Sequence, residues 1–281
     1  MSQEYKNIAD IIKERPVLCA SIVATSEHDC FDRLGRAVEK DIDLAELRLD
    51  FINNINENLA TDLISRSKIP LIVTNRNREN GGVFKDDEKT RLSIIGNCIE
   101  AKPAFIDIEL STNEKDRDKI IDLAKQNDVG VICSYHDFRT TPTENDIHRI
   151  YQEMSNTGAD LVKMVFSPNS SEDAKRILRS NYYLRYEKTP YTIFGMGKVG
   201  QNTRLLSLLL GSCLTYCSIE NNNQNGLFQI SVEEMKKYFK HIEKMGWQNM
   251  RQRGSEILEL SMIELNEDKD HLFKSIDLSV R

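Results

Sequence analysis

A lysine inside an apolar run is the residue of this sequence that most clearly suggests chemistry. Lys163 lies in LVKMVF (161–166), where a solvated surface lysine would be out of place. Burial and neighbouring cations such as Arg48 and Arg76 both favour the neutral amine, which can attack a carbonyl. A protonated imine acidifies the carbon beside it, so β-elimination becomes possible without a metal. The alternative is a lysine at a strand end whose charged head reaches solvent.

A histidine one strand away could supply the base that this chemistry needs. His136 lies in SYHDF (134–138), and a neutral imidazole titrates near neutral pH, so it can both take and return a proton. Taken alone, a histidine at a strand end is more often a hydrogen-bonded structural group. Its place beside the lysine strand favours the acid–base role.

Eight short apolar runs bounded by turn signals are typical of buried β-strands. They cover residues 17–23, 43–49, 70–75, 104–110, 129–135, 160–166, 190–196 and 213–219. The stretches between them show helical spacing, and three begin with capping patterns at Ser111, Ser170 and Ser231. This alternation predicts an α/β fold, a (β/α)8 TIM barrel that forms one catalytic domain over residues 1–246. A doubly wound open sheet would alternate in the same way, so the strand count is what favours the barrel.

The remaining residues, 247–281, are more polar and form a C-terminal extension. SEILELSMIEL (255–265) is its one helical patch. An extra helix, an oligomer contact and a loose tail are all compatible with this composition, so the role of the extension stays open.

Several of the expected strands carry polar residues on one face. In DLAELRLD (43–50), Ala45, Leu47 and Leu49 alternate with Leu44, Glu46, Arg48 and Asp50. Because side chains alternate along a strand, the apolar set suits helix packing and the charged set must point into the barrel. The same reasoning points further residues inward: Thr74, Arg76, Asp107, Glu109, Ser134, His136 and Lys163. A buried ion-pair network that merely fills the barrel is the alternative, but burying so many charges is a poor way to gain stability.

Composition excludes several classes of protein. A net charge of −6 argues against bulk nucleic-acid binding, and an anionic substrate would need a local cluster of arginines. No apolar run reaches the roughly 18 residues of a membrane span, and the N-terminus shows no signal or transit peptide, so a cytoplasmic protein is expected. The six cysteines lack metal or disulfide spacing, which predicts reduced, buried thiols.

In combination, these motifs resemble the type I 3-dehydroquinate dehydratase family over about residues 16–246. ELRLD, T-x-R before paired glycines, DIEL, S-x-H-D-F with T-P downstream, DLVKM and GMGKVGQNTR occur in the family's order. The matching segments are residues 46–50, 74–82, 107–110, 134–142, 160–164 and 195–204.

The resemblance implies a role for each matching residue. Lys163 would be the Schiff-base lysine and His136 the general acid and base. Arg204 and Arg76 would help to bind the substrate, whose carboxylate needs cations, while Glu46 and Arg48 would hold its hydroxyls. Two further substrate contacts would come from Ser21 and Gln229.

The implied reaction is a metal-free and cofactor-free dehydration of the small molecule 3-dehydroquinate. An imine forms at the ketone, His136 removes the α-proton, the β-hydroxyl leaves as water, and hydrolysis releases 3-dehydroshikimate. The family serves the shikimate pathway of aromatic amino-acid biosynthesis, and homodimers are common in it. We therefore expect a homodimer that binds neither nucleic acid nor membrane.

Two departures from the family's pattern stand out. The family usually has Glu before the paired glycines, thought to orient the catalytic histidine, where this sequence has Asn80. Asn cannot stabilise an imidazolium by charge, which predicts a lower rate or a shifted pH optimum. The second departure is NGLFQ (225–229), which replaces a Ser and a later Pro-Gly before Gln, so a role of Asn225 in substrate contact is left open.

Three other functions compete with this prediction. The segment from Gly195 to Glu220 satisfies the pattern of a dinucleotide-binding unit, which would suit an NAD-binding oxidoreductase. Only 61 residues follow Glu220, too few for the rest of such a domain. The others are a non-catalytic barrel that binds a shikimate-like ligand, and another imine-forming aldolase or transaldolase.

Overall fold

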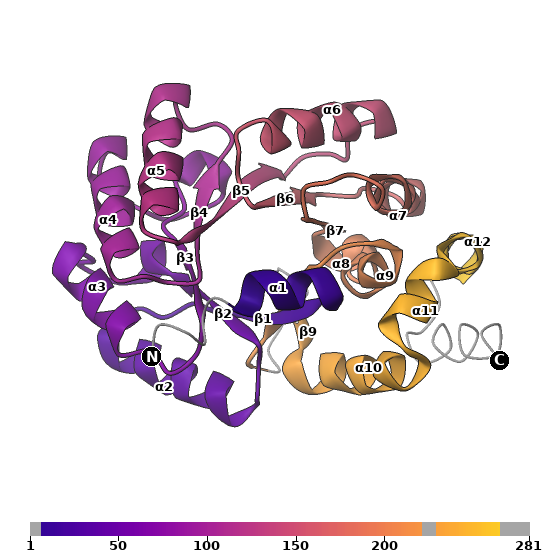
Figure 1. Ribbon diagram of the computed structural model, residues 1–281, viewed down its shortest axis with the longest axis horizontal. Helices are drawn as coiled ribbons and strands as arrows, with labels where there is room; N and C mark the ends of the chain where they lie inside the picture. Colours follow the sequence, from indigo (N-terminus) through magenta and orange to yellow (C-terminus); the bar gives the residue numbers. More distant parts are fainter. Residues whose placement is uncertain (1–6, 221–228, 265–281) are drawn as a thin grey trace.

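The computed structural model describes residues 7–220 and 229–264. Within them, nine strands form one parallel sheet in the order β7-β6-β5-β4-β3-β2-β1-β8-β9 (Figure 1). The strands are β1 Val17–Ile22, β2 Leu44–Arg48, β3 Leu71–Thr74, β4 Phe105–Glu109, β5 Gly130–Asp137, β6 Leu161–Phe166, β7 Tyr191–Gly195, β8 Leu214–Ser218 and β9 Ile230–Ser231. Eight of them lie where the apolar runs predict them. The short β9 was not predicted, because two residues leave no periodic signal.

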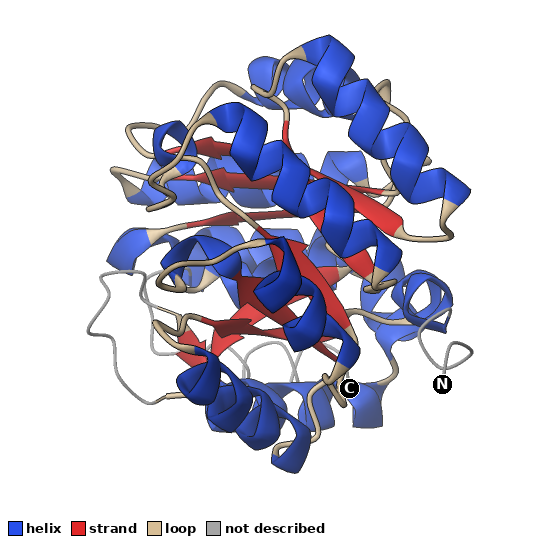
Figure 2. Cartoon of the chain, turned by 90° about the vertical axis from the view of Figure 1, so that its left-hand side faces the viewer, coloured by secondary structure: helices blue, strands red, loops and turns tan. Residues whose placement is uncertain are grey.

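The sheet curls until β7, at one edge, meets β8 near the other edge. The backbone N–H of Cys213 donates to the carbonyl of Tyr191 over 2.9 Å, and the hydroxyl of Thr192 donates to the carbonyl of Leu214 over 2.6 Å. These bonds join the start of β7 to the start of β8, while β8 pairs with β1 over five residues. Helices surround the curled sheet (Figure 2). This arrangement agrees with the predicted (β/α)8 barrel.

The helices alternate with the strands and cover the outside of the barrel. They are α1 Asn7–Glu14, α2 Glu27–Glu39, α3 Glu57–Ser65, α4 Glu88–Glu100, α5 Glu114–Gln126, α6 Glu144–Ser155, α7 Ser171–Leu184, α8 Gly197–Gly200, α9 Thr203–Leu210, α10 Val232–Met245, α11 Trp247–Gln252 and α12 Gly254–Glu264. Two short 3-10 helices, Leu49–Phe51 and Arg78–Asn80, follow β2 and β3.

Two of the three predicted helix starts are confirmed. Ser170 forms a capping box with Asp173 at the start of α7, and the Ser231 hydroxyl accepts the N–H of Glu234 at the start of α10. The prediction at Ser111 is wrong, because Asn113 caps α5 instead. The Ser111 hydroxyl accepts a hydrogen bond from the side chain of Asn80 over 2.9 Å, so it serves the loop after β3.

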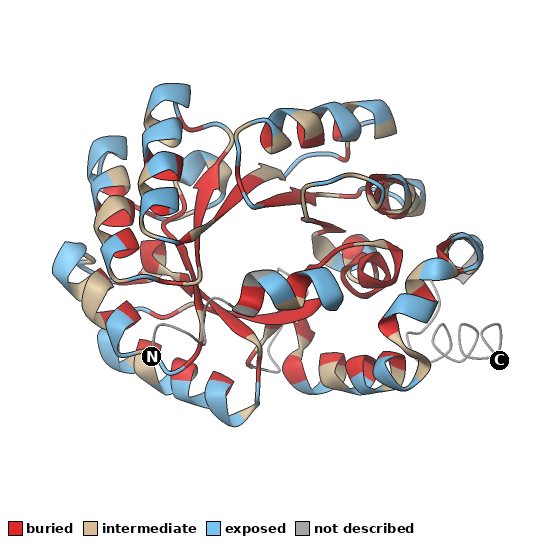
Figure 3. Ribbon diagram, in the orientation of Figure 1, coloured by how far each residue is buried: buried red, intermediate tan, exposed pale blue. Residues whose placement is uncertain are grey.

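Apolar residues form two separate layers around the sheet. Ala45, Leu47 and Leu49 belong to the large outer layer between strands and helices, as predicted, while Leu44 faces inward. The inner layer fills the end of the barrel where the strands begin, and Ile8 and Ile12 of α1 pack against it. Figure 3 shows the strands mostly buried and the helices exposed on their outer faces. The barrel is therefore closed at this end, which leaves the opposite end for a site.

The chain beyond α10 packs onto the barrel. Helices α11 and α12 contact α7 and α9, and Trp247, Met250 and Ile257 are buried in the outer apolar layer. The helical patch predicted in the extension corresponds to α12, whereas α11 was not predicted. The division of the chain at residue 246 stays a prediction.

Two predictions from composition, on the cysteines and on membrane-spanning segments, can be compared with the structure. All six cysteines are buried and free, as predicted. Among the described residues, no helix has the length and apolar character that crossing a membrane requires.

Candidate active site

A cavity of about 460 Å³ opens at the ends of the strands, opposite the apolar plug. All eight site residues predicted from the sequence line it: Ser21, Glu46, Arg48, Arg76, His136, Lys163, Arg204 and Gln229. The strand arrangement explains much of this convergence, because parallel strands β1, β2 and β5 carry their site residues at or near their carboxyl ends, Arg76 follows β3, and Lys163 points inward from the middle of β6. Arg204 comes from α9, and Gln229 directly precedes β9. The carboxyl end of a barrel is where this fold places its active sites.

Lys163 lies on the inside of the barrel, and only 4% of its surface is exposed. Its Nζ donates to Glu46 Oε1 over 2.9 Å and to Asp107 Oδ2 over 3.3 Å, and it lies 4.3 Å above the ring of Tyr216. The sequence predicts that cations surround Lys163. That prediction is incomplete, because two carboxylates are in direct contact with the amine. The lysine is held as one partner of an ion pair, and a proton must leave it before the nitrogen can act as a nucleophile.

A buried ion network runs from this lysine to the neighbouring strands. Arg76 donates to Asp107 Oδ2 over 2.7 Å and to the hydroxyl of Ser134 over 2.6 Å, and it pairs with Glu109 over 3.1 Å. Glu109 in turn pairs with Arg91 of α4 over 2.8 Å. Burial opposes the ionisation of Asp107, but Arg76 and Lys163 outweigh it and hold the pKa of this carboxyl below its usual value. The network fixes the charges around the lysine.

His136 is the penultimate residue of β5, and its surroundings favour the neutral form of its ring. Burial is the main cause that lowers its pKa well below 6.5, and the charges of Arg76 and Lys163 lower it further. The ring stacks on Phe138 with 5.9 Å between centroids, and Nδ1 is shielded from solvent without a hydrogen-bond partner. A neutral imidazole with one nitrogen unengaged can accept a proton from a molecule in the cavity.

Arg204 brings a buried positive charge to the other side of the cavity. Only 3% of its surface is exposed, its guanidinium lies 4.3 Å above the ring of Phe194, and Nε and Nη1 have no hydrogen-bond partner among the described residues. Burial lowers its pKa from 12.5 to about 10. An unpaired cation in a buried position is costly, and an anion that enters the cavity would remove that cost.

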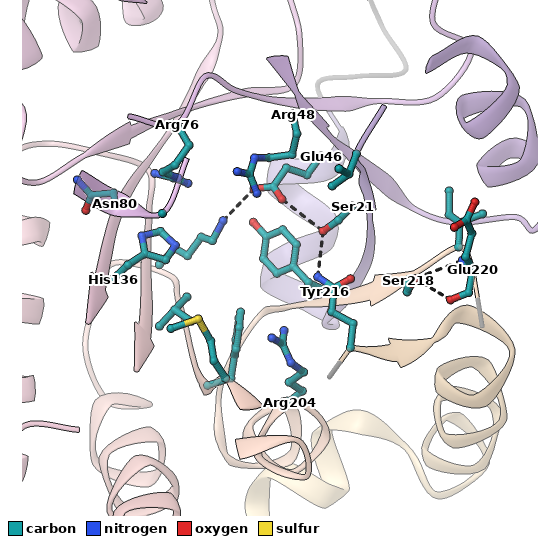
Figure 4. A pocket seen from close by; sticks show the side chains of 18 of the residues that line it. Ser21, Glu46, Arg48, Arg76, Asn80, His136, Arg204, Tyr216, Ser218 and Glu220 are labelled. Atoms are coloured by element: carbon teal, nitrogen blue, oxygen red, sulfur yellow. Dashed lines mark hydrogen bonds and ion pairs between the residues drawn. The ribbon is translucent and has the colours of Figure 1, made fainter. Parts of the chain in front are cut away.

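The remaining predicted residues form the wall between these groups. Glu46 also accepts hydrogen bonds from Thr74 over 3.1 Å and from Ser21 over 3.3 Å, and Gln229 donates to the Ser21 hydroxyl over 3.3 Å. Arg48 is held by Asp50 through two hydrogen bonds of 2.9 and 2.8 Å. Figure 4 shows Arg48, Glu46 and Ser21 side by side, with Arg204 on the far side of Tyr216.

Comparison with known proteins shows what this site belongs to. A family model described as type I 3-dehydroquinase matches residues 18–245. The chain belongs to the type I 3-dehydroquinase family. The 3-dehydroquinate dehydratase of Methanosarcina acetivorans is 34% identical over 232 residues, which cover 80% of this chain and 95% of that protein. The one from Methanococcus maripaludis is 31% identical over 231 residues, 80% of this chain and 100% of that protein.

A solved structure agrees with this assignment. The type I 3-dehydroquinate dehydratase from Clostridium difficile, crystallised with covalently modified comenic acid, has a TM-score of 0.78 and 25% identity. The match covers 82% of this chain and 94% of that one. Membership of the type I 3-dehydroquinase family makes this chain a hydro-lyase, a 3-dehydroquinate dehydratase that serves the shikimate pathway, and confirms the resemblance seen in the sequence.

Among the lining residues that sequence reasoning missed, Tyr216 and Phe194 are the most closely involved. Tyr216 lies beside Lys163, its hydroxyl is buried without a partner, and its ring centroid lies 5.9 Å from that of Phe194. Strand alternation could have found both residues, because Tyr216 follows Leu214 inward by two positions and Phe194 follows Thr192. Their apolar character made them look like core.

Asn80 lies on the cavity wall of this type I 3-dehydroquinase but is turned toward its own loop. Its Nδ2 donates to Asn77 Oδ1 over 2.8 Å and to the hydroxyl of Ser111. No hydrogen bond joins it to His136 within the part of the chain that the structure describes, which agrees with the unpartnered Nδ1 of the histidine. Asn225 and most of the NGLFQ segment lie outside the described residues.

The glycine-rich segment from Gly195 to Glu220 does not form the dinucleotide-binding site that the competing oxidoreductase prediction requires. Glu220, which would hold a ribose in a dinucleotide site, pairs with Arg33 over 2.9 Å and with Arg36 over 3.4 Å. Gly195 and Gly200 instead allow β7 and α8 to touch, because a Cβ on Gly200 would lie 2.4 Å from the carbonyl carbon of Gly195. This close contact sets the start of α9, which carries Arg204.

Proposed function

We propose that this dehydratase forms an imine between Lys163 and the ketone of 3-dehydroquinate, and that His136 moves the protons. One observation carries the proposal: the buried Nζ of Lys163 shares a cavity of about 460 Å³ with a neutral His136 and an unpaired Arg204. A nucleophile, a base and an anion partner are the three groups that the dehydration of an anionic hydroxyketone needs.

The chemical steps balance without an added oxidant or reductant. The neutral amine of Lys163 adds to the ketone carbon. The hydroxyl of the carbinolamine takes up the proton that the lysine lost and leaves as water, which gives a protonated imine. His136 takes the proton from the adjacent carbon, the electrons form an enamine, and this expels the β-hydroxyl, which leaves as water with the proton from the imidazolium. Addition of water to the resulting conjugated imine then releases 3-dehydroshikimate and the amine.

Charge explains how an acidic protein holds an anionic substrate. We assign the carboxylate to Arg204, because its Nε and Nη1 have no protein partner. Arg76 adds positive potential, although Asp107, Ser134 and Glu109 already engage its guanidinium. Arg48, Glu46, Ser21 and Gln229 form the wall on which the hydroxyls would lie. The Clostridium difficile relative was crystallised with covalently modified comenic acid, which supports the covalent step proposed here.

Borohydride trapping tests the nucleophile and the substrate together. Reduction in the presence of 3-dehydroquinate should add the mass of the reduced adduct to the peptide that contains Lys163, and Lys163→Met should abolish both adduct and turnover. His136→Gln should still be trapped but should lose on the order of 10²- to 10⁴-fold in kcat, since imine formation precedes the proton transfer. Trapping at another lysine, or normal turnover in Lys163→Met, would overturn the proposal.

We also propose a homodimer and a cytoplasmic location for this enzyme, as the family resemblance implies. Light scattering of the purified protein tests the first, with a mass of about twice 32.3 kDa expected. Cell fractionation tests the second, with the dehydratase activity expected in the fraction that contains no membranes.

A further inference from the structure

A second cavity lies at the opposite end of the barrel from the active site. It has a volume of about 320 Å³ and is lined by Arg185, Tyr186, Gly211, Arg251 and Gln252. Gly211 lies between the end of α9 and the start of β8, and Arg185 lies directly after α7 in the segment that leads to β7. Arg251 comes from α11, in the segment beyond residue 245 where the family match ends. The proposed dehydration uses none of these residues.

Arg251 shows the same unpaired state as Arg204. Its side chain is partly buried, and Nε and Nη2 are shielded from water without a hydrogen-bond partner. Burial lowers the pKa of Arg251, as it does for Arg204. Tyr191 and Cys213 lie near enough to influence this charge, but neither is an anion under ordinary conditions. Within residues 7–220 and 229–264, the guanidinium therefore lacks the counter-charge that a buried cation needs.

The two unpartnered nitrogens form the edge of arginine that binds a carboxylate. Elsewhere in this chain, Nε and Nη2 of Arg48 hold both oxygens of Asp50 at 2.9 and 2.8 Å. The same two atoms of Arg91 hold both oxygens of Glu88 at 2.7 Å. Because a planar fork with two parallel N–H groups matches a carboxylate, the edge of Arg251 is suited to that group.

A second guanidinium adds to the positive charge at this cavity. Arg185 lies 3.9 Å above the ring of Tyr182 and 4.7 Å above that of Tyr186, and it donates to the Arg251 carbonyl over 3.3 Å. The cavity lining among the described residues contains two arginines and no acidic residue. The ring of Tyr186, which is 72% exposed, offers an apolar face at the rim.

We propose that this cavity is a second ligand site, which takes a small carboxylate with an apolar body. The carboxylate pairs with the Nε and Nη2 edge of Arg251, and the apolar body lies against Tyr186 beside Gly211. The local pair of arginines overcomes the net charge of −6. This site is separate from the active site and does not depend on the proposed function.

Benzoate, with neutral benzamide as its matched control, tests the proposal by isothermal titration. Because benzoate could also bind at Arg204, the measurement uses Arg204→Met, which keeps the second cavity intact. This variant should bind one benzoate per chain and should not bind benzamide. Arg204→Met with Arg251→Met should bind benzoate at least tenfold more weakly, and Arg251→Lys in the same background should also lose at least tenfold, because it keeps the charge but not the fork.

The controls separate folding and catalysis from binding. Arg251→Met alone should keep the unfolding midpoint and the dehydratase activity of the unchanged protein, since it removes a buried charge that has no partner. Equal benzoate affinity with and without Arg251, or equal affinity for benzamide, would overturn the proposal. So would the absence of benzoate binding to a folded Arg204→Met variant. None of these results bears on trapping at Lys163, so the two proposals fail independently.

Discussion

The surroundings of His136 determine the pH range in which it can act as a base. Burial lowers its pKa well below 6.5, and the nearby charges of Arg76 and Lys163 act in the same direction. A group with a lowered pKa takes up its proton only at lower pH. The ring therefore remains neutral, and able to act as a base, at pH values somewhat below 6.5. Asn80 brings no negative charge that would counter this effect.

Asn80→Glu should therefore move the acid limb of the pH profile of kcat/KM to higher pH. A carboxylate near the ring stabilises the imidazolium and raises its pKa, and it should also raise kcat by about tenfold, since one pKa unit corresponds to about 1.4 kcal/mol. Asn80→Gln is the matched control, because it adds the same length without charge. A limb that stays in place in Asn80→Glu would show that residue 80 does not act on His136.

The ring and the hydroxyl of Tyr216 should contribute differently. The ring lies under the Lys163 nitrogen at 4.3 Å, whereas the hydroxyl is buried without a partner. Tyr216→Phe keeps the ring, so kcat should stay within about twofold and the free energy of unfolding should rise by about 1 kcal/mol. Tyr216→Leu removes the face that stabilises a positive nitrogen, and kcat should fall by about tenfold. Equal kcat values for the two variants would exclude a contribution of the ring.

At the scale of elements, the ion network joins β3, β4, β5 and β6 through their inward faces. Asp107 of β4 contacts both Arg76, which follows β3, and Lys163 of β6, and its Oδ1 accepts the hydroxyl of Ser134 on β5 over 2.6 Å. Removal of one partner from a buried pair leaves the other charge uncompensated, which costs more than the pair itself contributes. The network therefore makes these strands interdependent.

Asp107→Asn should lower the free energy of unfolding by about 3 kcal/mol at neutral pH. Asp62→Asn is the control, because the Asp62–Arg66 pair is exposed and screened by solvent, so its loss should change the free energy of unfolding far less. Urea denaturation measures both. The pKa of Asp107 is lowered in the folded state, so its contribution to the free energy of unfolding is complete above pH 3.8 and declines below it. The stabilities of Asp107→Asn and of the unchanged protein should therefore approach each other in acid. A loss as small as that of Asp62→Asn would contradict the interdependence.

Strand positions and inward faces could be predicted from the sequence because both depend on local alternation. Glu46, Arg76, Asp107 and Lys163 point inward as the two-residue period requires. The contacts among them could not be predicted, because the closeness of Asp107 to Lys163 depends on the curvature of the whole sheet. The helix start at Asn113 was missed for a similar reason, since the tertiary partner Asn80 engages the Ser111 hydroxyl.

At the scale of the whole molecule, the segment beyond the family match is part of the folded core. Helix α11 packs against α9 and α10, where the ring of Trp247 contacts that of Phe239, and α12 packs against α7 and α9. Trp247, Met250 and Ile257 are buried there, and α9 carries Arg204 near its start. Full burial of a large apolar side chain contributes roughly 1.5–3 kcal/mol, so the three together contribute at least about 4.5 kcal/mol. The extension thus stabilises the side of the barrel that presents the unpaired arginine.

A chain that ends at residue 246 should consequently lose about 5 kcal/mol of unfolding free energy, or fail to accumulate as folded protein. Ile257→Ala gives a milder test in the full-length chain, with an expected loss of 2–5 kcal/mol and an unchanged kcat at low temperature, because the cavity it leaves lies outside the active site. Denaturation of a chain that ends at residue 264 separates the two helices from the residues that follow. If the 246-residue chain were as stable as the full chain, α11 and α12 would not belong to the cooperative unit that holds α9 in place.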